Sequence, residues 1–170
     1  MRIATFALFL GLAYISAGVL GLVPAALLPA PADAPPTRYS ALYGYLLGLF
    51  PVNALHSILH LGIGIWGVVA WRRVANPKFF ARALAVVYGV LAVLGLIPGV
   101  NTLFGLVPLH GHDVWLHAGT ALVAAYFGWR TEHEVERRAN PAPDRREQSV
   151  PVARERRFGH GDRRLPTSEV

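Results

Sequence analysis

Long apolar stretches alternate with short polar segments along this chain. Four stretches approach the about 20 mainly apolar residues that a transmembrane helix needs, and they cover residues 3–23, 52–71, 79–97 and 114–129. In lipid, the backbone of such a stretch satisfies its own hydrogen bonds only as a helix. The pattern predicts an all-α fold, a polytopic membrane four-helix bundle in residues 1–130.

Two boundaries of these helices need a separate argument. Arg2 followed by an apolar region over residues 3–28 resembles a secretory leader, but the region is longer than the about 7–15 apolar residues usual for one, so we expect a permanent helix. The apolar run at residues 42–50 precedes Pro51. It either extends the second helix through a proline kink or lies outside a helix that Pro51 begins, and the sequence leaves both alternatives open.

The basic residues of the short loops predict the orientation, because cytoplasmic loops are enriched in Lys and Arg. With the N-terminus inside, only Arg38 lies outside, and the cytoplasmic set is Arg2, Arg72, Arg73, Lys78, Arg82 and Arg130. We therefore expect both termini in the cytoplasm.

The chain also resembles itself. At a shift of 57 positions, Pro51 aligns with Pro108 and His60 with His117; at a shift of 74, Tyr14 aligns with Tyr88. The pattern predicts a tandem two-helix repeat whose two units share one topology, so the pseudo-two-fold axis would follow the membrane normal. His60 and His117 are then equivalent positions at similar depth.

Composition supports a membrane domain followed by a charged tail. The chain is 54% apolar and 15% charged, with a mean hydropathy of +0.40, which excludes an ordinary soluble enzyme. The absence of cysteine excludes disulfides and thiolate sites. Residues 131–170 lack periodicity and mix acids with paired arginines, which is typical of disorder. These arginines can contact anionic lipid headgroups. The bilayer is the expected partner, and no nucleic acid is expected, because the other basic residues flank apolar segments.

Polar side chains gather on two of the predicted helices. Asn53, His56 and His60 are spaced i, i+3 and i+7 and share one face, with Ser57 beside them. Asp113 and His117, spaced i and i+4, share a face of the fourth helix, and His110 and His112 precede them. Ionisable groups within a membrane usually face the bundle interior and suggest function. We expect a polar cluster between the second and fourth helices.

Several interpretations of this cluster remain open. The default is structural, with histidines hydrogen-bonded between helices, Asp113 as a helix cap and no cofactor. His60 and His117 could instead hold haem b. A divalent metal could use His56, His60, Asp113 and His117, and a proton or small-solute pathway is the remaining alternative. No nucleophile triad or phosphate-binding loop is present, so the default is a non-enzymatic protein. The many helix glycines permit close packing within the bundle or a homodimer.

Two segments resemble a known family. They are Leu55-His56-Ser57-Ile58-Leu59-His60-Leu61 and Val107-Pro108-Leu109-His110-Gly111-His112-Asp113-Val114-Trp115-Leu116-His117. Both are similar to signatures of DUF4383, a family of bacterial four-helix membrane proteins, and the resemblance covers about residues 3–130. Family members often carry asparagine at the positions of Ser57, His110 and Val114. The resemblance implies the fold and a location in the bacterial inner membrane, and it implies no activity.

Overall fold

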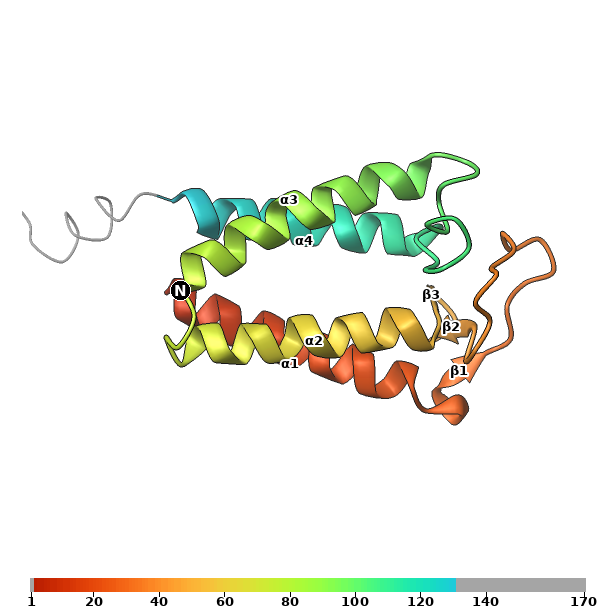
Figure 1. Ribbon diagram of the computed structural model, residues 1–170, viewed down its shortest axis with the longest axis horizontal. Helices are drawn as coiled ribbons and strands as arrows, with labels where there is room; N and C mark the ends of the chain where they lie inside the picture. Colours follow the sequence, from red (N-terminus) through yellow and green to blue (C-terminus); the bar gives the residue numbers. More distant parts are fainter. Residues whose placement is uncertain (1, 131–170) are drawn as a thin grey trace, which may run out of the picture. The chain divides into compact units, whose positions relative to one another are not determined.

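Four antiparallel helices form the bundle in the computed structural model, which describes residues 2–130 (Figure 1). They are α1 (Ile3–Gly21), α2 (Ala54–Trp71), α3 (Pro77–Leu96) and α4 (His112–Trp129). The predicted tail at residues 131–170 lies outside the described residues. Helices α1, α2 and α3 are long and apolar enough to cross a membrane. The polar residues of the candidate cluster make α4 less apolar, but it is as long as α2. The chain is an all-α, multi-pass membrane protein.

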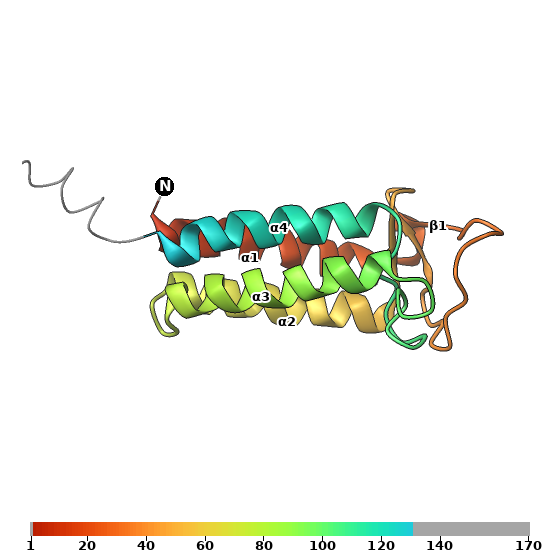
Figure 2. The same ribbon diagram turned by 90° about the horizontal axis from the view of Figure 1, so that it is seen from above.

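The helices associate as two pairs. Helix α1 packs along α2, and α3 packs along α4. Seen from above, the two pairs face each other, so that α4 lies near α1 and α3 near α2 (Figure 2). The stacked rings of Phe6 and Phe127, 4.6 Å apart, connect α1 with α4. Trp66 packs edge-on against Phe80 at 5.1 Å and connects α2 with α3. Aromatic packing therefore joins the pairs at the end of the bundle near Arg2.

Glycines bring α1 and α2 into direct backbone contact. A Cβ atom on Gly11 would lie 2.8 Å from the carbonyl oxygen of Gly64, and one on Gly64 would lie 2.7 Å from the carbonyl oxygen of Gly11. Small residues at such positions permit the close approach that stabilises membrane helix pairs. This pair is therefore specified by the absence of side chains at its crossing point.

A small antiparallel sheet covers the opposite end of the bundle. It consists of β1 (Leu27–Leu28), β2 (Gly44–Leu46) and β3 (Phe50–Val52), in the order β1-β2-β3, and follows a short 3-10 turn, η1 (Pro24–Ala26). Residues 42–50 thus do not extend α2, which begins at Ala54, two residues after the predicted boundary. Pro51 pairs with Tyr45 across β2 and β3. Strands of two or three residues are too short to produce a recognisable alternation in sequence.

The side chain of Asn53 connects the start of α2 with the loops at this end of the bundle. Its side chain accepts a hydrogen bond from the backbone N–H of His56 at 2.9 Å and so caps α2. Its amide nitrogen donates to the carbonyl oxygens of Tyr39, at 3.0 Å, and Leu106, at 2.7 Å. One buried side chain therefore links the helix start to both loops at this end. It also fixes the rotation of α2, on which the candidate histidines lie.

Candidate functional site

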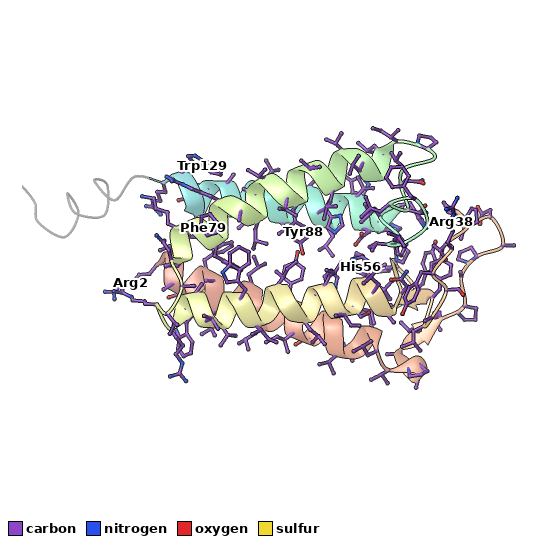
Figure 3. All side chains as sticks on the ribbon, in the orientation of Figure 1. Arg2, Arg38, His56, Phe79, Tyr88 and Trp129 are labelled. Carbon is purple, nitrogen blue, oxygen red and sulfur yellow. The ribbon has the colours of Figure 1, made fainter. Side chains whose placement is uncertain are left out.

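Five aromatic rings form a closed loop inside the bundle, with at least one ring from each helix. His56 lies 4.4 Å from His60 and 6.2 Å from His117, between ring centroids. Tyr14 lies 5.0 Å from His60, Tyr88 lies 5.0 Å from His117, and the two tyrosines are 5.4 Å apart. Figure 3 shows His56 and Tyr88 between the two helix pairs. The loop holds the three imidazoles in fixed positions beside Asp113.

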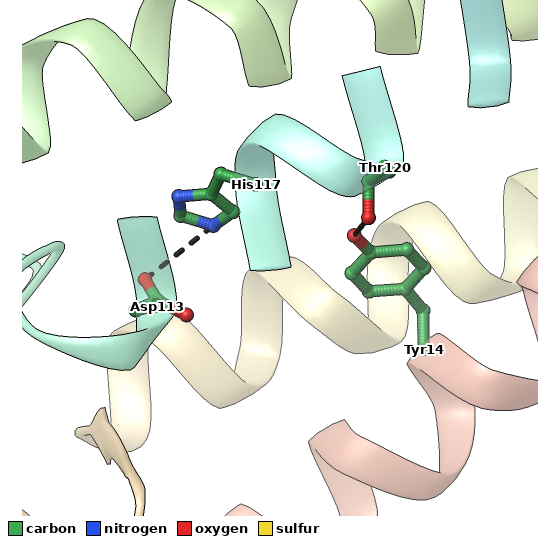
Figure 4. A network of polar contacts seen from close by, with 4 residues as sticks. All are labelled: Tyr14, Asp113, His117 and Thr120. Atoms are coloured by element: carbon green, nitrogen blue, oxygen red, sulfur yellow. Dashed lines mark hydrogen bonds and ion pairs between the residues drawn. The ribbon is translucent and has the colours of Figure 1, made fainter. Parts of the chain in front are cut away.

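Three potential metal ligands converge next to this loop. His56, Asp113 and His117 each offer a ligand atom, and these atoms lie within 4.8 Å of one another. Nε2 of His117 and Oδ2 of Asp113 are 3.5 Å apart (Figure 4). All three side chains are buried, with exposed fractions of 1% to 3%. His60 is outside this group of three, and its ring is tilted by 57° against that of His56.

Five polar atoms of the cluster lack hydrogen bonds to other described residues. Nδ1 of His56, His60 and His117 and both carboxylate oxygens of Asp113 are buried without such a bond. Within residues 2–130, these five atoms make none of the hydrogen bonds between helices that the default structural interpretation expects. The expected cap is wrong as well, because Gly111 is the N-cap of α4 and Asp113 lies in its first turn without capping. Buried polar atoms of this kind call for an explanation, such as an ion or ordered water.

The other polar residues predicted for the cluster have separate environments. Asn53 and Ser57 are used locally, since the Ser57 hydroxyl donates to the Asn53 carbonyl oxygen at 2.9 Å. His110 is buried 6.3 Å from the Tyr45 ring, and this burial lowers the pKa of its imidazole. His112 is exposed at the start of α4. The structure thus separates His110 and His112 from the group of three.

Sequence reasoning left three residues out of the cluster. Tyr14 and Tyr88 complete the ring loop, and the Tyr14 hydroxyl lies 3.2 Å from the Thr120 hydroxyl on α4 (Figure 4). The two tyrosines align with each other at the shift of 74 positions, which was the available signal. The sequence gives no signal for Thr120, because its contact with Tyr14 depends on how α1 and α4 are placed relative to each other.

The geometry favours a metal ion over haem. Haem held by His60 and His117 needs room for the macrocycle between the two imidazoles. Here Tyr14 and Tyr88 connect these imidazoles through consecutive ring contacts of 5.0, 5.4 and 5.0 Å. The rings would have to separate to admit a porphyrin, whereas a single ion needs only small movements of three side chains.

The family follows from a comparison with family models. The model of DUF4383, a domain of unknown function, matches residues 4–130. The chain belongs to the DUF4383 family. The match includes all four helices and every residue of the ring loop. Comparisons with curated proteins and with solved structures found no match. Membership in DUF4383 assigns no activity, so the chemistry is argued from the cluster.

Proposed function

We propose that this DUF4383 protein binds a divalent transition-metal ion inside the membrane, with His56, Asp113 and His117 as ligands. The observation that carries the proposal is the convergence of three buried ligand atoms within 4.8 Å, on two helices. Two imidazoles and one carboxylate suit ions such as Zn²⁺, Fe²⁺ or Mn²⁺. Three protein ligands also leave a coordination position open.

The separations are compatible with such an ion. Metal–ligand bonds of about 2.0–2.2 Å place two ligands of one ion no more than about 4.4 Å apart. The His117–Asp113 pair, at 3.5 Å, already meets this limit. All three ligand atoms lie within 4.8 Å of one another, so small side-chain movements would bring the third ligand within range.

A bound ion would also account for the unpartnered atoms. Carboxylate oxygens and imidazole nitrogens that make no hydrogen bond in an apolar interior are costly. A divalent ion offsets the negative charge of Asp113 and accepts a lone pair from each imidazole. Hydrogen bonding between helices explains these atoms less well, because they make no such bond within the described residues.

Equilibrium dialysis against Zn²⁺ or Co²⁺, followed by elemental analysis, tests the proposal. Wild-type protein in lipid nanodiscs should retain about one ion per chain. His117→Ala and Asp113→Asn should reduce the affinity by about tenfold or more, as the loss of a ligand would. His112→Ala is the matched control, since His112 is exposed on the same helix. Equal retention by all four proteins would overturn the proposed site.

A tandem duplication is a second part of the proposal. Five of the six buried residues of α1 lie 74 positions before a buried residue of α3, and five of the six of α2 lie 57 positions before one of α4. The Tyr14–His60 and Tyr88–His117 pairs, equivalent under these shifts, both have a centroid separation of 5.0 Å, with interplanar angles of 63° and 70°. These equalities support a pseudo-two-fold axis that passes between Tyr14 and Tyr88.

The arrangement of charges supports a proposed orientation. Arg2 and Trp129 lie at one end of the bundle and Arg38 at the other (Figure 3). Cation–π contacts of Arg72 with Trp71, at 5.1 Å, and of Arg82 with Trp129, at 5.6 Å, are typical of a membrane interface. We place this end in the cytoplasm of a bacterium and the sheet on the outer face of the inner membrane.

A further inference from the structure

The end of the bundle that holds the starts of α1 and α3 is strongly basic. Four arginines at this end form no ion pair with another residue of the described part of the chain; they are Arg2, Arg72, Arg73 and Arg82. Both carboxylates of residues 2–130 lie at the opposite end, one in the loop after β1 and one in the first turn of α4. This end therefore attracts anionic groups.

Arg82, in the second turn of α3, is held in place by the end of α4. Its Nε donates a hydrogen bond to the carbonyl oxygen of Gly128 at 2.9 Å, and its guanidinium lies 5.6 Å from the centre of the Trp129 ring. The side chain is exposed, and its two Nη nitrogens make no hydrogen bond to another described residue. Guanidinium groups bind phosphate through such parallel N–H groups, and the contacts with α4 orient this one in advance.

An apolar stripe on α3 begins at Arg82. Val86, Val90 and Val93 follow on the same face of the helix, and each is more than half exposed. In a bilayer this face meets acyl chains. From Arg82 to Val93 the helix rises about 17 Å, which is close to half of the about 30 Å hydrocarbon core. The stripe therefore matches one leaflet, with the guanidinium at the level of the headgroups.

The stripe and the charge together select the ligand. A ligand that covers the stripe needs an acyl chain, which a soluble phosphate lacks. A choline or ethanolamine group beside the phosphate would lie among arginines, with no carboxylate of the described residues at this end to offset its charge. An anionic phospholipid such as phosphatidylglycerol supplies the chain and the phosphate without that cation.

We propose that Arg82 binds the phosphate group of an anionic phospholipid, whose acyl chain lies along Val86, Val90 and Val93. Trp129 lies beside the guanidinium at this end of the bundle (Figure 3), where aromatic rings are typical of the headgroup level. The site is at the opposite end of the bundle from His56 and Asp113, and it does not depend on the metal proposal.

A lipid titration tests the proposal. Native mass spectrometry measures the binding of phosphatidylglycerol or phosphatidylcholine, with identical acyl chains, to the full-length protein in detergent. The full chain keeps the acidic residues of 131–170 as competitors for the arginines. Phosphatidylglycerol should bind with a Kd about fivefold lower, or lower still. Equal affinities for the two lipids would overturn the proposal.

Two variants of Arg82 separate lipid binding from the role of the residue in the fold. Both lose the hydrogen bond from Nε to Gly128, but Arg82→Lys keeps the positive charge and Arg82→Gln does not. Arg82→Gln should raise the Kd for phosphatidylglycerol by about fivefold, and Arg82→Lys should retain most of the affinity. Equal losses in the two variants would assign the effect to the Gly128 contact and overturn the site.

Arg72→Gln is the matched control for position. Arg72 lies at the same end of the bundle, and its guanidinium lies 5.1 Å from the centre of the Trp71 ring. It follows α2, however, and is not on the stripe of α3. Arg72→Gln should change the Kd for phosphatidylglycerol by less than about twofold, because the attraction between charges at this distance is screened. A loss as large as that of Arg82→Gln would indicate diffuse attraction and overturn a site at Arg82.

Discussion

The ring of Tyr14 in α1 lies 5.4 Å from the ring of Tyr88 in α3, and this contact joins the two helix pairs at the level of the histidines. Each tyrosine packs on the histidine of its own pair, His60 or His117, at the same distance of 5.0 Å. The contact therefore lies where the proposed pseudo-two-fold axis would pass. It also fixes how far apart the two pairs stand, and so positions Asp113 and His117 on α4 opposite His56 on α2.

Removing the Tyr14 hydroxyl should weaken the link between α1 and α4. Tyr14→Phe keeps the ring contacts and loses the contact with the Thr120 hydroxyl at 3.2 Å. Interhelical hydrogen bonds in membranes contribute about 0.6 kcal/mol on average. We therefore expect the free energy of unfolding to fall by about 0.5–1.5 kcal/mol. Thermal unfolding in detergent measures it. Tyr126→Phe is the control, because Tyr126 is exposed. If Tyr126→Phe lowered the stability as much as Tyr14→Phe does, the prediction would be contradicted.

The crossing of α1 and α2 should not tolerate a methyl group. Gly11→Ala places a Cβ atom 2.8 Å from the Gly64 carbonyl oxygen. Backbone must move to relieve this contact, at a cost of about 1–3 kcal/mol or more. Gly62 is the matched control, because a Cβ atom there meets nothing within 4 Å. Gly62→Ala should leave the melting temperature unchanged or raise it, since alanine favours helix by up to about 1 kcal/mol.

Asn53 should stabilise the fold more than an ordinary helix cap does. Asn53→Ala removes the cap of α2 and leaves the carbonyl oxygens of Tyr39 and Leu106 without their donor. We expect the free energy of unfolding to fall by about 2–4 kcal/mol, because buried polar groups lose their hydrogen-bond partners. Asn76→Ala removes only an exposed cap from α3 and should cost about 1 kcal/mol. Equal losses in the two variants would show that the contacts with the loops contribute nothing.

His110 should make the fold sensitive to acid. Burial lowers the pKa of its imidazole in the folded chain, whereas the unfolded chain takes up the proton near pH 6.5. Below that pH the unfolded state binds more protons, so stability falls as pH falls. His110→Gln should reduce the dependence of melting temperature on pH between about 7 and 5. His112→Gln, at an exposed position, should leave it as in the wild type.

The sequence predicts the four helices well because each must satisfy its backbone within lipid, and hydropathy records this requirement directly. It also predicts that His56, Asp113 and His117 belong to one region, because their spacings place them on helix faces. It cannot predict the sheet near Pro51, whose strands are stabilised by contacts between distant loops. Nor can it predict the Tyr14–Thr120 contact or the separation of His60 from the ligand group. These depend on how the helices are rotated and packed against one another, which no local pattern encodes.

Exchanging the two ligands at equivalent positions provides the strictest test of the metal centre and the duplication together. At the shift of 57 positions, His56 corresponds to Asp113 and His60 to His117. The double variant His56→Asp/Asp113→His therefore builds the image of the ligand set across the pseudo-two-fold axis. In the exchanged protein, His60 is the third ligand and His117 lies outside the ligand group, as His60 does in the wild type.

The Zn²⁺ affinities of four variants, His117→Ala and His60→Ala in each background, are compared with those of the two parent proteins. In the wild-type background His117→Ala should weaken binding by about tenfold or more, and His60→Ala should weaken it by less. In the exchanged background the order should reverse, with His60→Ala the severe change. A metal centre without the symmetry would lose its affinity on exchange, and a duplication without the metal centre would leave all of these proteins unable to bind. The reversal is expected only if both proposals hold, because it requires the two histidines to occupy equivalent environments.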